Sequence, residues 1–452
     1  MQKPNGTQTA TSPSPSLMLR MRGMYYGWWL AAAGMGLGFL GALNNYGFGV
    51  FFLPITRELG LSRAQTSLVF SAARLEGGIE APLAGWLTDK LGPRTMLLVG
   101  NTLTGIGFIL LGTVVHSFWA LFFVWVFVTS VGFQTGFFTG IMAAMNSWFM
   151  RHRAKAISVV SSSNRIGGFV WTPLLGYLVV SQNWHTAAVI CGIVVLVVGT
   201  PLSLVFRRSP ESMGLRPDGA SPATGGPAAR SGRPAGAPAS PDGSQDFTVG
   251  EALRTPTFWI LAGAQFCRML SFSAISVHLI PMLVWKGQSQ LGAAFIASLY
   301  PLVGIPMTLV FGFLGDRYGT KQLLAATTLL SALSLSLLAF GSSLYYLYLF
   351  VFLYGIAESA GSLNLAMTGH LFGRRSFATV RGILNAITVL GPFAAPIYAG
   401  WVFDQSESYL WALVPFFVFK ALAGPLYLLV PRPRPTQRML QASTALRERG
   451  ES

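Results

Sequence analysis

Long apolar runs recur along almost the whole chain. A helix that crosses about 30 Å of hydrocarbon needs roughly 20 largely apolar residues, and the 452-residue sequence repeatedly offers runs of this length. Charged residues make up only 10% of the chain, whereas a soluble domain carries about 25%. These runs override the roughly three soluble domains that the length alone would suggest. We therefore expect an all-α membrane protein.

Twelve runs fit the length of a membrane span, six before residue 207 and six after residue 255. They lie near 26–52, 64–88, 95–114, 118–147, 156–180, 185–206, 257–283, 290–314, 322–341, 344–371, 379–403 and 409–430. Residues 207–246 between the two sets are rich in Pro, Gly, Ala and Ser and lack aromatic residues, which is typical of a flexible connector. The predicted organisation is a polar tail (1–22), a six-helix half (23–206), a cytoplasmic linker (207–255), a second six-helix half (256–430) and a basic tail (431–452).

The formal net charge of +16 reflects membrane topology and not a nucleic-acid surface. If both termini are cytoplasmic, 24 of the 31 Lys and Arg residues fall in inner segments, and only Arg57, Arg63 and Lys286 fall in outer loops. Positive charge accumulates on the cytoplasmic side of membrane proteins. We therefore expect cytoplasmic termini, the lipid bilayer as partner, and no nucleic acid.

The two halves share sequence. The segment GWLTDKLGPR at 85–94 recurs as GFLGDRYGTK at 312–321, in each half directly after the second run and at an offset of 227. Further pairs at an offset of 223 are Phe149 with Phe372, Arg151 with Arg374, Gly168 with Gly391 and Pro173 with Pro396. The pattern predicts a parallel six-plus-six duplication, and such duplicated transporters bind their substrates between the repeats.

GWLTDKLGPR resembles the signature loop of the major facilitator superfamily. MYYGWWL at 24–30, SPESMGLRPDG after the sixth run and FTVGEALRTPTFW before the seventh are similar to bacterial relatives of the monocarboxylate transporters and oxalate:formate antiporters. The resemblance implies a multi-pass protein of the bacterial plasma (inner) membrane that works as a monomer, without a cofactor. It also implies alternating-access transport of a small organic anion such as a monocarboxylate, by proton symport or anion exchange. The arginine that the monocarboxylate type carries in its eighth helix is missing from 290–314.

The signature loop predicts a gate. Asp89 ends the second run, where the helix dipole disfavours a negative charge, so its carboxylate needs a positive partner. The resemblance makes that partner the amino end of a helix from the other half, together with Arg151 or Arg153. Gly85 and Gly92 are expected to let backbones approach closely. The predicted gate comprises Gly85, Asp89, Arg94, Arg151, Arg153, Gly312, Asp316, Arg317 and Arg374.

Charged residues inside the runs are candidate site residues, because each charge at a membrane centre costs about 2.5 to 3.5 kcal/mol. In the second run Glu76 and Glu80 share one helix face, and Arg74 lies about 200° around the helix from Glu76. The two carboxylates could carry a proton, or could form structural salt bridges with Arg165. Arg268 is the favoured anion anchor because a guanidinium binds a carboxylate with two hydrogen bonds. A permanent salt bridge with Glu358 is the alternative, and Lys420 is expected to lie at the periphery.

The predicted substrate-binding residues are Arg268, Arg74, Asn45, Tyr46, Gln134 and Arg165, and the predicted proton-coupling residues are Glu358, Glu76 and Glu80. The two cysteines, Cys191 and Cys267, lie in apolar runs without metal-ligand spacing, so no metal site is expected.

A secondary transporter of a small organic anion is the favoured function. A proton-driven exporter of amphipathic drugs or metabolites is an alternative, supported by the 13% aromatic content and the missing arginine of the eighth run. A non-transporting membrane sensor is an alternative of another class. No zinc-binding HExxH, nucleophile elbow or Walker loop occurs, so no enzymatic activity is expected.

Overall fold

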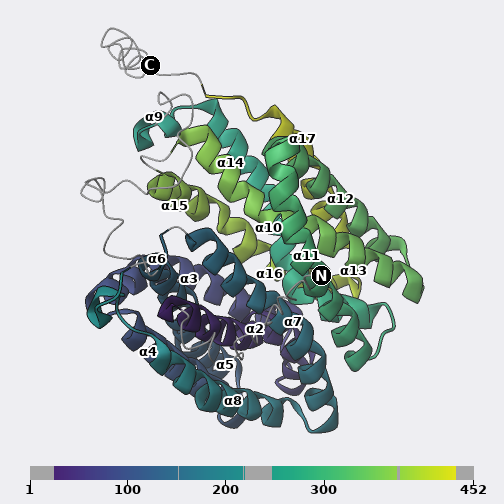
Figure 1. The fold of residues 1–452 in the computed structure, drawn as a ribbon. Helices are drawn as coiled ribbons and strands as arrows, with labels where there is room; N and C mark the ends of the chain where they lie inside the picture. Colours follow the sequence, from purple (N-terminus) through teal and green to yellow (C-terminus); the bar gives the residue numbers. More distant parts are fainter. Residues whose placement is uncertain (1–24, 151, 217, 219–246, 374–376, 434–452) are drawn as a thin grey trace, which may run out of the picture.

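The computed structural model describes residues 25–150, 152–216, 218, 247–373 and 377–433. Within these ranges every regular element is a helix (Figure 1), which confirms the all-α prediction. The predicted tail 1–22 and the centre of the predicted linker lie outside the described residues.

The first half contains six long helical segments that match the predicted runs. They are α2 (Tyr26–Glu58), α3 (Arg63–Leu91), α4 (Pro93–Thr113), a composite of α5 (Phe118–Phe123), η1 (Val124–Ser130), η2 (Phe133–Gly140) and α6 (Ile141–Trp148), then α7 (Arg153–Ser181) and α8 (Trp184–Val205). Two short elements, η3 (Glu211–Met213) and α9 (Val249–Leu253), lie at the two ends of the predicted linker.

The second half follows the same order. Its elements are α10 (Pro256–Trp285), α11 (Gln290–Tyr318), α12 (Thr320–Phe340), a composite of α13 (Leu344–Glu358), η7 (Ser359–Ser362) and α14 (Leu363–Phe372), then α15 (Phe377–Thr388), α16 (Leu390–Ser406) and α17 (Leu410–Leu429). Over the described residues, ten helical segments are long and apolar enough to cross a membrane. The other two long helices, α3 and α7, have 29 residues each and are more polar.

The duplication is visible in the backbone. α3 and α11 have 29 residues each and α4 and α12 have 21 each, all at the sequence offset of 227. Ser62 and Ser289 occupy the same place in the repeat, and each side chain caps the helix that follows it. The loop glycines Gly92 and Gly319 both have a positive φ, +85° and +86°, which side chains of L-residues disfavour.

Gly85 differs from the expectation. A Cβ atom placed on Gly85 meets no atom within 4 Å, and the same holds for its repeat mate Gly312. The predicted close approach of a backbone to Gly85 is therefore wrong for this structure. Gly85 lies inside α3, whereas Gly92 has the positive φ that requires glycine.

The two halves form two bundles (Figure 1), with α7 packed against α11, α3 against α16 and α2 against α10. At one end of the bundles, hydrogen bonds between the halves join Arg63 or Ala64 with Asp404, Arg63 with Tyr409, Ser67 with His278, and Val50 with Gln290. We call this region, where α2 ends and α3, α11 and α17 begin, the closed end. The signature loops lie at the opposite ends of α3 and α11.

The apolar core, like these hydrogen bonds, joins the two halves near the closed end. One buried cluster runs through the first half and continues into the second half near the closed end, where it includes Ile275 and Ala399. A separate cluster around Phe258, Phe311 and Met367 belongs to the second half alone. The halves therefore share a core near the closed end, and the opposite end of the second half has a core of its own.

Candidate substrate site

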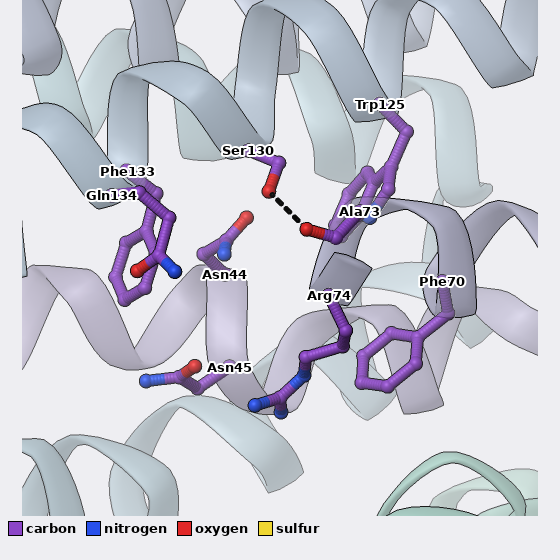
Figure 2. Close-up of a pocket in the computed structure, with 9 residues that line it drawn as sticks. All are labelled: Asn44, Asn45, Phe70, Ala73, Arg74, Trp125, Ser130, Phe133 and Gln134. Atoms are coloured by element: carbon purple, nitrogen blue, oxygen red, sulfur yellow. Dashed lines mark hydrogen bonds between the residues drawn. The ribbon is translucent and has the colours of Figure 1, made fainter. Parts of the chain in front are cut away.

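A pocket of about 340 Å³ opens among α2, α3, η1 and η2 (Figure 2). Small-molecule sites range from about 300 to 1,000 Å³, so this volume suits a small metabolite. The lining residues are Asn44, Asn45, Phe70, Ala73, Arg74, Trp125, Ser130, Phe133 and Gln134. The structure thus brings together three of the predicted substrate-binding residues, Arg74, Asn45 and Gln134.

Arg74 is the charged residue of this pocket. Its guanidinium carbon lies 4.9 Å from the centre of the Phe70 ring, and the side chain is exposed to the pocket. Figure 2 shows its guanidinium on the same side of the pocket as the Asn45 amide. Within the described part of the chain, Arg74 forms no ion pair and no hydrogen bond. An uncompensated guanidinium at this depth favours an anionic ligand.

Irregular helices build the walls of the site. The fourth helical segment adopts π-helical turns, η1 and η2, which carry Trp125, Ser130, Phe133 and Gln134 into the pocket. The residue of the second half that corresponds to Phe133, the first residue of η2, is residue 360 at the repeat offset of 227. It lies in η7, the short helical turn that interrupts the tenth segment. Interrupted helices of this kind mark binding sites in duplicated transporters. Sequence periodicity cannot detect these interruptions, because the residues on both sides favour a continuous helix.

The carboxyl groups of Glu76 and Glu80 interact with each other on the face of α3 that meets η1 and η2. The Thr135 hydroxyl donates a hydrogen bond to Glu80. One oxygen of each carboxyl group, Oε2, is buried without a hydrogen-bond partner. No salt bridge joins either glutamate to Arg165 among the described residues, so the structural pairing considered for them is not formed.

Arg165 reaches from α7 toward the second half. A Cβ atom on Gly304 of α11 would lie only 2.1 Å from its Nη1 atom, so Gly304 leaves the room that the guanidinium occupies. Tyr46 stands beside it, with its ring 6.0 Å from the Tyr300 ring of α11 and packed on Gly168. Arg165 therefore lies where the two halves meet, and it makes no ion pair within the described residues.

Arg268 lies in a buried charge network. Its Nη2 atom donates a 2.9 Å hydrogen bond to Glu358 Oε2, and Ser331 donates a 2.9 Å bond to Oε1. Lys420 also donates to Glu358. Arg268 is 2% exposed, Glu358 7% and Lys420 0%, so solvent hardly reaches the network. The salt bridge with Glu358, the alternative considered for Arg268, is formed.

Lys420 corrects an expectation, because it is fully buried and paired rather than peripheral. Its position near the middle of α17 (Leu410–Leu429) is the sequence signal that could have placed it in the interior.

A family model for the Major Facilitator Superfamily matches residues 34–284 and 261–445, one match for each half. The chain belongs to the Major Facilitator Superfamily. Over 371 residues, this facilitator is 23% identical to monocarboxylate transporter 12-B of Danio rerio, covering 80% of this chain and 77% of that protein. It is 22% identical to the oxalate:formate antiporter of Oxalobacter formigenes, over 65% of this chain and 64% of the antiporter.

One further relative matches over a shorter stretch, and a solved structure matches over most of the chain. The probable sulfoacetate transporter SauU of Cupriavidus necator is 28% identical over 38% of this chain and 40% of its own length. The crystal structure of a bacterial homolog of the human lysosomal transporter Spinster, inward-facing and occupied, superposes with a TM-score of 0.68. It shares 18% identity and covers 90% of this chain and 97% of its own, so it supports the facilitator fold alone.

The predicted gate of this facilitator is only partly described. Asp89 is exposed, and its carboxylate has no partner among the described residues, although Arg208 donates a 3.4 Å hydrogen bond to its backbone oxygen. Arg94 is exposed, and the Arg317 guanidinium lies 5.4 Å from the Tyr318 ring centre. The remaining predicted gate members, Arg151, Arg374 and the side chains of Arg153 and Asp316, lie outside the described residues.

A network at the closed end was not anticipated from the sequence. Asp404 of α16 accepts hydrogen bonds of 2.9 Å from the backbone N–H groups of Arg63 and Ala64, the first residues of α3. The Arg63 guanidinium stacks 3.3 Å from the centre of the Phe403 ring and donates a 2.7 Å bond to the Tyr409 hydroxyl.

His278 extends this network into the interior. Its Nδ1 atom lies 2.9 Å from the Tyr409 hydroxyl, and its Nε2 atom lies 2.9 Å from Ser67 Oγ. The imidazole is fully buried. The network therefore joins α3 of the first half to α10, α16 and α17 of the second.

Proposed function

We propose that this facilitator is a secondary transporter of a small organic anion and that Arg74 binds the anion. The unpaired guanidinium in this pocket carries the proposal, because a carboxylate supplies both the missing charge and two acceptor oxygens. The relatives named above for monocarboxylates, oxalate, formate and sulfoacetate agree with this class of substrate.

Alternating access explains the arrangement of the halves. We place twelve helices across the plasma membrane with both termini in the cytoplasm, as the distribution of Lys and Arg favours. The closed end then faces outward, and the structure corresponds to an inward-facing state. The greater polarity of α3 and α7 supports the assignment, since their charged residues Arg74 and Arg165 face the pathway and not the lipid.

The Glu76–Glu80 pair is the proposed proton site. Two ionised carboxylates in contact repel each other, which favours the uptake of one proton by the pair. Glu80 follows Arg74 by six residues on α3, so proton uptake and anion binding would act on the same helix. Glu358 is less suited to proton exchange, because Arg268 and Lys420 hold its carboxylate from both sides.

Uptake of labelled carboxylates into proteoliposomes tests the proposal. We expect Arg74→Gln to lower uptake by about 10- to 100-fold, the effect of losing charge-assisted hydrogen bonds. Arg254→Gln is the matched control, because Arg254 is exposed at the end of α9, away from the pocket. Wild-type uptake by the Arg74 variant would exclude Arg74 as the anchor.

A further inference from the structure

Two arginines that have no anionic partner among the described residues lie near Tyr46 of α2. Arg74 belongs to α3 and Arg165 to α7, and both interact electrostatically with the Tyr46 hydroxyl on α2. Neither forms an ion pair with any residue that the structure describes. Both guanidinium groups therefore act on the same Tyr46 hydroxyl.

Polar side chains link the Arg74 pocket with the part of α7 that carries Arg165. Asn45 lines the pocket beside Arg74, and its Nδ2 atom donates a 3.3 Å hydrogen bond to Asn164 Oδ1. Asn164 directly precedes Arg165 on α7. Polar side chains thus run from the Arg74 pocket through Asn45 to Asn164, the residue next to Arg165 on α7.

The neighbouring acids do not balance this charge. Glu76 and Glu80 interact with each other, and Glu80 also accepts a hydrogen bond from Thr135 of η2. Glu358 is already paired with two cations, Arg268 and Lys420. A bound monoanion would neutralise only one of the two free guanidinium groups, and the other would remain uncompensated in a medium that stabilises charge poorly.

We propose that the substrate is a dianion with two separate acidic groups, such as a short-chain dicarboxylate. One carboxylate binds Arg74 and the other binds Arg165, and the Asn45 amide lies between them. Phe70, Trp125 and Phe133 supply apolar surface for the carbon chain. The inference rests on the proposed anion transport at the same pocket and names its substrate class.

The test is equilibrium binding to the purified full-length protein with ligands matched in carbon chain. Acetate, propionate and butyrate are compared with malonate, succinate and glutarate, and inorganic phosphate and sulfate serve as single-centre dianions. We expect the best dicarboxylate to bind about 10- to 100-fold more tightly than its monocarboxylate counterpart, because a second charge-assisted contact forms.

Arg165→Gln should reduce the ratio of dicarboxylate affinity to monocarboxylate affinity to about one, while monocarboxylate binding at Arg74 persists. Arg165→Lys, which keeps the charge, should retain part of the preference, and Arg254→Gln should retain all of it. Unchanged melting temperatures show that the variants fold.

The outcomes separate this inference from the proposed function. If monocarboxylates bind as tightly as dicarboxylates, or if Arg165→Gln leaves the ratio unchanged, the dianion is excluded and anion transport stands. If phosphate and sulfate match the best dicarboxylate, two separate binding points are excluded. If the wild type binds none of these anions and transports none, the proposed function fails as well.

Discussion

Asp404 holds the two halves together at the closed end, so its removal should destabilise the state seen here. Its carboxylate accepts two backbone hydrogen bonds of 2.9 Å from the first turn of α3. A hydrogen bond to a charged group contributes about 1.5 to 3 kcal/mol, and a negative charge at a helix amino end contributes about 0.3 to 1 kcal/mol.

Both bonds are exposed to solvent, so values near the lower limits apply. Asp404→Ala should then destabilise the state with the closed end shut by about 3 kcal/mol. This shifts the equilibrium between shut and open closed ends roughly 100-fold toward open. Asp404→Asn keeps one acceptor oxygen and should cost about half as much.

The distance between the halves at the closed end reports the shift. Gln182→Cys and Gln405→Cys place spin labels on exposed residues of the two halves, after the native Cys191 and Cys267 are replaced by Ser. Electron spin resonance should detect a longer distance between the two labels, and this distance should be more populated in Asp404→Ala than in Asp404→Asn.

Glu407→Gln is the matched control for this measurement. It removes one negative charge from the same end of α16, and Glu407 makes no side-chain hydrogen bond to a described residue of the other half. If Asp404→Ala gives the wild-type distance distribution, or if Glu407→Gln gives the same shift, the reasoning about Asp404 is refuted.

Three further predictions concern the buried charges, the loop glycine and the proton site. Glu358→Gln leaves two buried cations unpaired and should lower stability by about 3 to 5 kcal/mol; a melting temperature in detergent equal to that of the wild type would contradict this. Gly92→Ala should cost about 1 to 3 kcal/mol because of the positive φ, whereas Gly85→Ala, inside α3 with room for a methyl group, should not lower the melting temperature in the same assay. Glu76→Gln should abolish the acceleration of uptake by an inward proton gradient but keep substrate exchange, and gradient-driven uptake that persists would exclude the pair as the proton site.

Local sequence predicted much of the fold. The expected run at 95–114 corresponds to α4 (Pro93–Thr113), and the expected run at 290–314 lies within α11 (Gln290–Tyr318). Apolar length and end signals such as Ser289 act within a few residues, so a single sequence contains the information. The duplication could also be predicted from the sequence, because Gly92 and Gly319 recur where the same turn needs a positive φ.

The sequence identified the charged residues of the membrane interior but could not rank them. Arg74 and Arg268 look alike as isolated charges in apolar runs, and Arg268 was the preferred anchor. The fold places Glu358 and Lys420, which lie 90 and 152 residues farther along the chain, around Arg268, and leaves Arg74 facing a pocket.

By itself, then, the sequence determined the helical segments, their duplication and the repeated turn at Gly92 and Gly319, because short-range hydrogen bonding and apolar length govern them. Tertiary structure alone decided which arginine is neutralised, where the π-helical turns of η1 and η2 open the pocket, and that Asp404 caps α3 from the other half. Each of these depends on contacts between segments distant in the chain, and the energy of a buried charge is set by the neighbours that those contacts supply.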